Sequence, residues 1–295
     1  MKHKLTLLLL FLSINLFAQH TVFQSQYLFD GLILNPAYAG SKEALNVTCL
    51  YRNQWVGLAG SPKTISLSGH VALKSKGSNV GFVLLNDKYG IDNHTKINVI
   101  YSYRFKLWRG ELSLGLQGTV DFYRANFDKI ITTQNNDPNF LPVAEKQAIP
   151  DAGFGIYYFT KKIFAGIVIP KLLDYKNNSS VKYKPITAYA GTLINLSDEV
   201  KLKPSFLVKY ISKSPVVLDL NTTFYWKDIV GIGVGYRTGE TLLASMDAKL
   251  NEQFRVGYCY EFGFSNLKKY SAGTHEIMLN YIFQYKINTK SSRYF

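Results

Sequence analysis

Hydrophobic and polar residues alternate most regularly in the run from Lys96 to Lys106. The apolar parity holds Ile97, Val99, Tyr101, Tyr103 and Phe105, and the other parity is polar apart from Ile100. Because successive side chains of a β-strand point to opposite faces, this run predicts a strand with one apolar and one charged face. The apolar face needs either a protein core or a lipid environment.

Similar runs recur along the rest of the chain and predict about fourteen strands, most with an apolar face. They lie near residues 45–51, 65–73, 79–87, 96–106, 112–122, 154–158, 163–170, 186–196, 202–210, 218–226, 230–236, 242–248, 254–262 and 277–283. A soluble core could not bury so many apolar faces. A closed barrel with lipid outside and polar groups inside can. We therefore predict an all-β fold, a transmembrane antiparallel β-barrel with an N-terminal plug or periplasmic segment.

Short and long connections alternate between these strands. Tight turns are expected near residues 76–78, 107–110, 160–162, 197–199, 226–228 and 251–253, and mostly longer connections at 53–63, 87–93, 125–151, 171–184, 212–215, 238–240 and 265–274. Outer-membrane barrels have short turns on the periplasmic side and long loops outside. The alternation predicts an even strand count with both chain ends in the periplasm.

The first eighteen residues have the pattern of a signal peptide. Lys2 and Lys4 precede the apolar run from Leu5 to Phe17, and Ala18 is the expected cleavage residue. The apolar run is shorter than the ~20 residues of a spanning helix and does not continue past Ala18, which disfavours a retained anchor. No cysteine directly follows this run, so a lipoprotein anchor is not expected. The mature chain is predicted to reach the bacterial outer membrane.

Residues 19–44 do not alternate but are rich in apolar side chains. Because this segment precedes the first strand, it starts on the periplasmic side. We expect it to fold back into the barrel as a plug, the alternative being a periplasmic tail ordered by a partner. The predicted organisation is a signal peptide (1–18), this N-terminal segment (19–44), the barrel (45–285) and a periplasmic C-terminal tail (286–295).

The chain is basic, with a formal net charge of +14, a mean hydropathy of −0.04 and 47% hydrophobic residues. Its cations are spread over turns and polar faces rather than clustered, so nucleic acid is not an expected partner. Anionic lipid head groups, including lipopolysaccharide, or an acidic protein fit better. Cys49 and Cys259 fall on opposite parities of their strands, which predicts two free thiols.

The sequence offers no catalytic constellation. It lacks G-x-S-x-G, H-E-x-x-H, C-x-x-C and P-loop motifs, so we expect neither an enzyme nor a bound cofactor or metal. His70 lies on a polar parity, where a hydrogen-bonding role in the lumen is expected. Asp247 and Glu276 are expected to pair across the lumen with one of the cations Arg104, Arg237, Lys249 and Arg255.

Several short motifs in the first half of the chain resemble one known family. They are Phe23-Gln24-Ser25-Gln26-Tyr27, Asn35-Pro36-Ala37-Tyr38-Ala39-Gly40, Tyr51-Arg52-Asn53-Gln54-Trp55, Gly60-Ser61-Pro62 and Ser68-Gly69-His70. Together they are similar to the PorP/SprF family of outer-membrane proteins of the type IX secretion system and gliding machinery. The resemblance is strong to about residue 125 and looser beyond. It implies a dedicated partner for a secreted protein, often an adhesin whose C-terminal domain directs it to this system, or a part of the secretion apparatus itself.

Two functions stay open at this point. In the first, the barrel is a platform that binds the C-terminal domain of an exported protein and supports its export or surface anchoring. The expected contact surfaces are the loops at 125–151 and 171–184 and the 53–63 loop, with Arg52, Trp55, Gly57 and Pro62 as candidate contact residues. Trp55 is expected either to cap the barrel or to anchor the partner. In the second, the barrel is a channel for small solutes.

Overall fold

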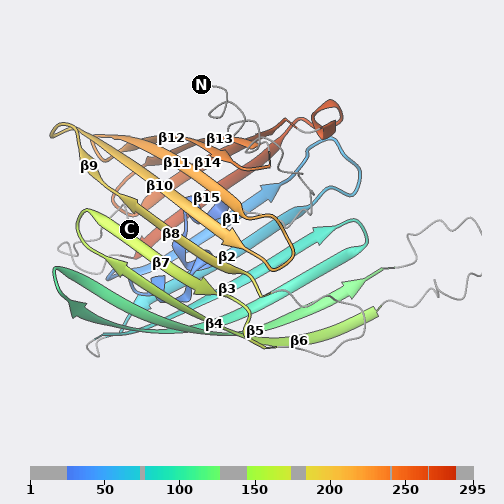
Figure 1. Cartoon of the computed structure of the whole chain (residues 1–295), viewed down its shortest axis with the longest axis horizontal. Coiled ribbons are helices and arrows are strands. Elements are labelled where there is room, and N and C mark those ends of the chain that lie inside the picture. The colour runs from blue at the N-terminus through green and yellow to red at the C-terminus, as the bar shows by residue number, and fades with distance from the viewer. Residues whose placement is uncertain are drawn as a thin grey trace, which may run out of the picture.

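The protein is a closed β-barrel with short helices inside it (Figure 1). The computed structural model describes residues 25–73, 77–126, 145–173, 184–239, 241–264 and 266–283. The strands are β1 (Leu45–Asn53), β2 (Lys63–Ala72), β3 (Ser78–Tyr89), β4 (Asp92–Leu107), β5 (Gly110–Ala125), β6 (Glu145–Phe159), β7 (Ile163–Ile169), β8 (Ile186–Thr192), β9 (Ile194–Asn195), β10 (Val200–Tyr210), β11 (Val217–Trp226), β12 (Val230–Arg237), β13 (Thr241–Lys249), β14 (Phe254–Gly263) and β15 (Thr274–Phe283). The helices are η1 (Ser25–Leu28), α2 (Gly31–Leu34), η2 (Pro36–Tyr38) and η4 (Asn266–Lys269).

Each strand pairs antiparallel with the next, and β15 closes the barrel on β1 with Phe283 opposite Leu45. The two-residue strand β9 continues β8, because both pair with β10 in one register. The fifteen strands therefore form a wall of fourteen, since β8 and β9 count as one. The predicted fold class, an antiparallel barrel with an even number of strands, is confirmed.

The two parities of the strands face different environments. Val99 on β4 is 68% exposed and Leu116 on β5 is 57% exposed, whereas Ser102 and Ser113 on the same strands are buried. Ile100, the apolar residue on the polar parity of β4, is buried in a cluster with Leu32 of α2. The exception to the alternation therefore marks a place where the wall touches the plug.

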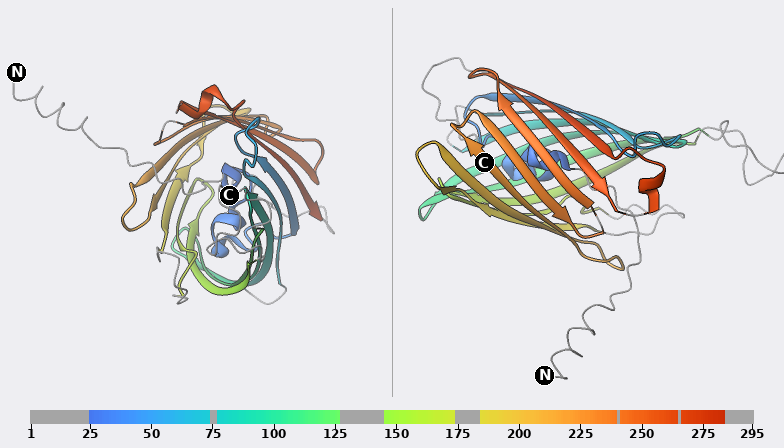
Figure 2. Two further views of the ribbon diagram at one scale, coloured as in Figure 1. Left: turned by 90° about the vertical axis from the view of Figure 1, so that its right-hand side faces the viewer. Right: turned by 90° about the horizontal axis from the view of Figure 1, so that it is seen from above.

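The interior of the barrel is filled by the segment 25–44, which we call the plug (Figure 2). Its helix η2 contacts β4, β5 and β6, and α2 contacts β2 and β3. Each of the three buried apolar clusters contains a plug residue: Phe29, Leu32 or Ala37. The hydrophobic core of this protein is thus shared between the lumenal wall and the plug.

Two connections are shorter than the alternation predicts. The long connection expected at 87–93 is a two-residue turn, because β3 extends to Tyr89 and β4 starts at Asp92. The long loop expected at 125–151 overlaps β6, which starts at Glu145 and pairs with β5 along its whole length. Polar side chains are common at these strand ends, and a run of polar residues is also typical of a loop, so the sequence pattern placed the strand ends too early.

Some predictions concern residues that the structure does not describe. The signal peptide and residues 19–24 lie outside the described residues, as do 127–144 and 174–183 within the two long loops, and the C-terminal tail 286–295. Cys49 and Cys259 are both free, as predicted. The described part of the chain contains no helix long and apolar enough to cross a membrane.

Candidate functional site: the plug and the lumenal wall

The segment Asn35–Gly40 is held by its own turn and by the wall. Asn35 caps η2, its Oδ1 accepting from the Ala37 N–H at 2.9 Å. The Asn35 Nδ2 donates to the Ile156 carbonyl oxygen at 3.0 Å and lies 3.1 Å from the Tyr189 hydroxyl. One side chain thus shapes the turn and fixes it to two strands.

Two glycines of the wall make room for this turn. Gly115 on β5 and Gly155 on β6 are opposite one another in the strand ladder. A Cβ at Gly155 would collide with the Asn35 side chain, and one at Gly115 would collide with the backbone of Pro36 and Ala37. The glycine pair is therefore a recess into which Asn35-Pro36-Ala37 fits.

The second half of the motif is held by polar contacts with β4, which pairs with β5, and with β2. The Ala39 carbonyl accepts from the Ser102 hydroxyl at 3.0 Å, and the Gly40 N–H donates to His70 Nδ1 at 3.1 Å. The Tyr38 ring lies edge-on to His70 at 5.6 Å between centroids. Gly40 has a φ of 72°, a left-handed conformation that glycine adopts without strain. His70 thus has the lumenal hydrogen-bonding role that its parity predicts.

The start of the plug is tied to a buried cluster of charges. Arg52 contacts Glu261 at 2.9 Å and also pairs with Glu276. Arg237 contacts Glu261 at 3.2 Å and Asp219 at 2.9 Å. All five side chains are nearly inaccessible to solvent.

Ser25 joins this cluster from the plug. Its N–H donates to Glu276 Oε1 at 3.2 Å, its hydroxyl donates to Glu261, and it accepts from Arg237 Nη2 at 2.6 Å. Because buried charges are stable only when they are paired and hydrogen-bonded, the cluster and the plug start depend on each other.

Of the two lumenal acids, Asp247 has one of its predicted partners and Glu276 does not. Asp247 pairs with Arg255 at 2.9 Å, as expected. Glu276 pairs with Arg52 and with none of the four cations proposed for it. Arg104 instead pairs with Glu111 at 3.2 Å, on the same hairpin. Arg52, a candidate contact residue together with the 53–63 loop, points its side chain into the lumen.

Two plug side chains have pKa values shifted by burial. Asp30 caps α2 by accepting from the Leu32 N–H at 3.0 Å and also accepts from the Ser68 hydroxyl. Burial raises the pKa of Asp30, against the effect of these hydrogen bonds. Burial, with the nearby Arg255 charge, lowers the pKa of Lys42 to about 7.

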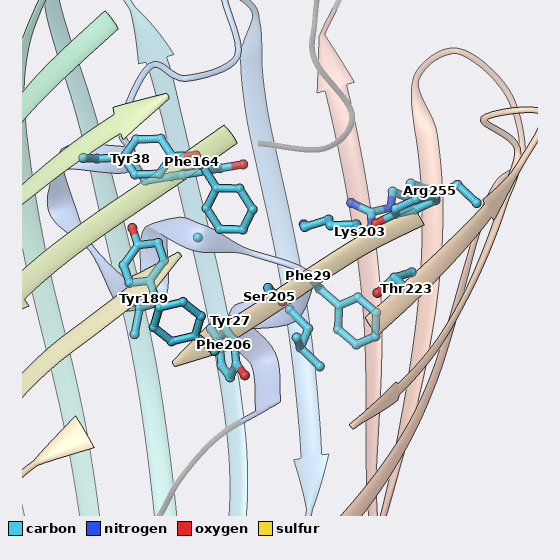
Figure 3. A pocket seen from close by; sticks show the side chains of 15 residues that line it. Tyr27, Phe29, Tyr38, Phe164, Tyr189, Lys203, Ser205, Phe206, Thr223 and Arg255 are labelled. Carbon is cyan, nitrogen blue, oxygen red and sulfur yellow. The ribbon is translucent and has the colours of Figure 1, made fainter. Parts of the chain in front are cut away.

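A small cavity remains between the plug and the wall (Figure 3). Its volume is about 70 Å³, and its lining includes Tyr27, Tyr38, Tyr189, Lys203 and Arg255. A space of this size holds a few water molecules rather than a metabolite, since one water occupies roughly 30 Å³ of liquid. No group of three or more metal-ligating side chains is found within the described ranges.

The candidate partner-contact residues other than Arg52 lie in the loop between β1 and β2, at the outer end of the barrel. Val56 pairs through its backbone with the loop before β15, its N–H donating to the Gly273 carbonyl at 2.9 Å. The Trp55 N–H donates to the Thr274 hydroxyl at 3.3 Å, and its side chain is half-buried. Gly57, with a φ of 102°, is exposed, and Pro62 is half-buried. The structure brings Trp55, Gly57 and Pro62 together and leaves Arg52 in the lumen.

Sequence reasoning identified the plug motif but missed its receptors, Gly115 and Gly155. Both glycines fall on the parity opposite to the apolar run of their strands. A glycine on a lumenal position of a strand indicates close approach of another backbone, which was the available signal. Which segment approaches could not be read from that signal.

Comparison with known proteins agrees with this architecture. The Acinetobacter baumannii outer membrane protein Omp33 is 10% identical with a TM-score of 0.50, over 83% of this chain and 100% of that one. The monoaromatic hydrocarbon channel CymD is 11% identical with a TM-score of 0.53, over 87% of this chain and 93% of that one. At such identities the likeness shows the fold alone. The comparison with curated proteins found no match.

The fold is one that outer-membrane β-barrels share. The description "Type IX secretion system membrane protein PorP/SprF" belongs to a family profile that matches residues 16–281, nearly the whole chain. The matched region includes the entire plug and all the strands except the last two residues of β15. The chain belongs to the PorP/SprF family of type IX secretion system membrane proteins.

Proposed function

We propose that this protein is a non-enzymatic platform in the outer membrane that binds the C-terminal domain of a cognate secreted protein and supports its export or surface anchoring. Membership of the PorP/SprF family supports a role in type IX secretion. The plug is the observation that favours a binding platform over an open channel. It shares the three buried apolar clusters with the wall and is bonded to a buried charge cluster.

The outer ends of the strands offer the contact surface. The loop at 54–62 is joined by backbone hydrogen bonds to the loop before β15 and to the β3–β4 turn, where the Gly90 N–H donates to the Gly60 carbonyl at 2.8 Å. Tyr270 is 70% exposed beside this loop, its carbonyl lying next to Gly57. An ordered surface with exposed aromatic groups is suited to binding a folded domain.

Deletion of the gene tests this proposal. We expect one secreted protein, or a small set sharing a type of C-terminal domain, to disappear from the cell surface while other exported proteins remain. Surface proteomics of deleted, complemented and parent cells measures this. Unchanged surface display of every exported protein would refute the platform, and normal display with lost uptake of a small solute would favour the channel.

Replacing Trp55 with alanine tests the contact loop. The side chain is half-buried at the outer end of the barrel, and an aromatic anchor at an interface is worth about 2 kcal/mol or more. We expect normal assembly with substrate retention reduced roughly 30-fold, measured by co-purification of the secreted protein. Trp226→Ala, at the opposite end of the barrel, is the matched control. Equal retention by the two variants would remove Trp55 from the contact surface.

A further inference from the structure

The outer face of the barrel has a large apolar groove. It has a volume of about 910 Å³ and crosses β6, β7, β8, β10, β11, β12 and β13. Ala165 and Ala190 are small residues in it, between the larger Ile163, Phe206 and Leu220. These larger side chains are 45% to 48% exposed on the lipid-facing parity, so the groove opens toward the bilayer.

The wall is interrupted under this groove. The β8–β10 ladder ends with Gly191 opposite Ser205 and resumes in β9 with Ile194 opposite Leu202. Pro204 stands in the gap and has no N–H to donate. On the β7 side the pairing continues, because the Leu193 N–H donates to the Lys162 carbonyl at 2.6 Å in register with the Ile163–Thr192 pair. Thr192 and Pro204, the residues at the gap, both line the groove.

The lumen lies directly behind this interruption. Phe164, Ser205 and Phe206 line both the outer groove and the small cavity beside the plug (Figure 3). The strands β7, β8 and β10 lie side by side in the wall (Figure 1). A single layer of residues therefore separates the plug cavity from the bilayer at a place where main-chain pairing is incomplete.

Two cations stand at the short-turn end of the groove. Lys161 and Lys162 are exposed in the β6–β7 turn, immediately before Ile163 of the groove. Neither has an acidic partner in the described part of the chain. The cations of neighbouring turns are paired, with Lys227 and Glu199 at 3.2 Å and Lys201 and Asp228 at 2.7 Å. The charge of the β6–β7 turn is thus left for an external anion.

We propose that the groove is a specific binding site for a phospholipid of the inner leaflet. One acyl chain lies across Ala165 and Ala190 over the interrupted ladder, and the phosphate binds at Lys161 and Lys162. Short turns of such barrels face the periplasm, which places these lysines at the level of the phosphate groups. The acyl chain covers the gap and separates the plug cavity from the bilayer. A phospholipid fits both the apolar groove and the adjacent cations, whereas an apolar protein segment would leave the lysines unmatched.

Native mass spectrometry of the full-length protein, purified in detergent and stripped of loosely held lipid, tests this proposal. We expect a single phospholipid to remain on the barrel. Ala190→Trp, which fills the groove from its lipid-facing side, and the double variant Lys161→Glu/Lys162→Glu are each expected to lose it. Adding phosphatidylglycerol back to stripped wild-type protein should raise its melting temperature, and diacylglycerol, which lacks the phosphate, should not.

Two control variants separate this site from lipid that coats any barrel. Val99→Trp adds the same side chain to an exposed lipid-facing position on β4, a strand that does not line the groove, and Lys268→Glu/Lys269→Glu reverses two exposed adjacent lysines on η4. Both are expected to keep the lipid and the melting shift. The proposal is overturned if site and control variants retain lipid equally, if stripped wild-type protein retains none, or if a peptide occupies the site.

Discussion

Replacing Gly155 with valine is expected to expel the plug and open the barrel. The glycine is lumenal, and any Cβ there collides with the Asn35 side chain, which caps η2 and is bonded to β6. Overpacking a tight contact costs typically 1–3 kcal/mol, and the branched side chain also removes the space for Pro36. In planar bilayers we expect the wild-type protein to conduct little and the variant to show large, stable conductance steps.

The neighbouring strand supplies the control for this experiment. A Cβ at Gly118 on β5 would meet no described atom within 4 Å, so Gly118→Val should assemble and stay closed. The double variant Asn35→Gly/Gly155→Ala removes the colliding side chain and should conduct less than Gly155→Ala alone, because contacting residues are energetically coupled. A closed Gly155→Val barrel would show that the plug is not seated at the glycine pair.

The wall of this protein could be predicted from sequence because one physical rule controls it. Alternation assigns a face to nearly every strand residue, and the exception at Ile100 is buried against the plug rather than exposed. Strand ends were less predictable, because a polar residue such as Asp87 suits both a lumenal strand position and a loop. Asp87 is in fact a strand residue bonded to Thr64 at 2.7 Å.

The lumenal site could be predicted only in part. The motif from Asn35 to Gly40 was found through its resemblance to a family, but periodicity says nothing about which wall residues it touches. Those contacts join residues that lie from 30 positions apart, as with Gly40 and His70, to 121 positions apart, as with Asn35 and Ile156. The lumenal place of Arg52, by contrast, could be predicted from its parity. It shares the parity of Leu50, which is lumenal and buried, and not that of the exposed Tyr51.

Arg52→Met is expected to destabilise the barrel more than any other single loss of charge discussed above. The residue is 1% exposed and pairs with Glu261 and with Glu276, which is fully buried. Removing one member of a buried ion cluster leaves uncompensated charge and costs about 3–5 kcal/mol. The loss should appear as a lower urea midpoint when the protein is unfolded from lipid vesicles, followed by its heat-modified mobility in gels.

An arginine-to-methionine substitution in a partly exposed ion pair is the control. It separates the loss of the buried charge cluster from the general effect of losing an arginine. Arg104 contacts Glu111 at 3.2 Å, and the Glu111 side chain is 37% exposed, so Arg104→Met should cost no more than about 1 kcal/mol. The double variant Arg52→Met/Glu276→Gln removes both members of one pair and should recover much of the loss, because the penalty comes from the carboxylate left behind. If Arg52→Met and Arg104→Met unfold at the same urea concentration, the buried cluster does not hold the start of the plug.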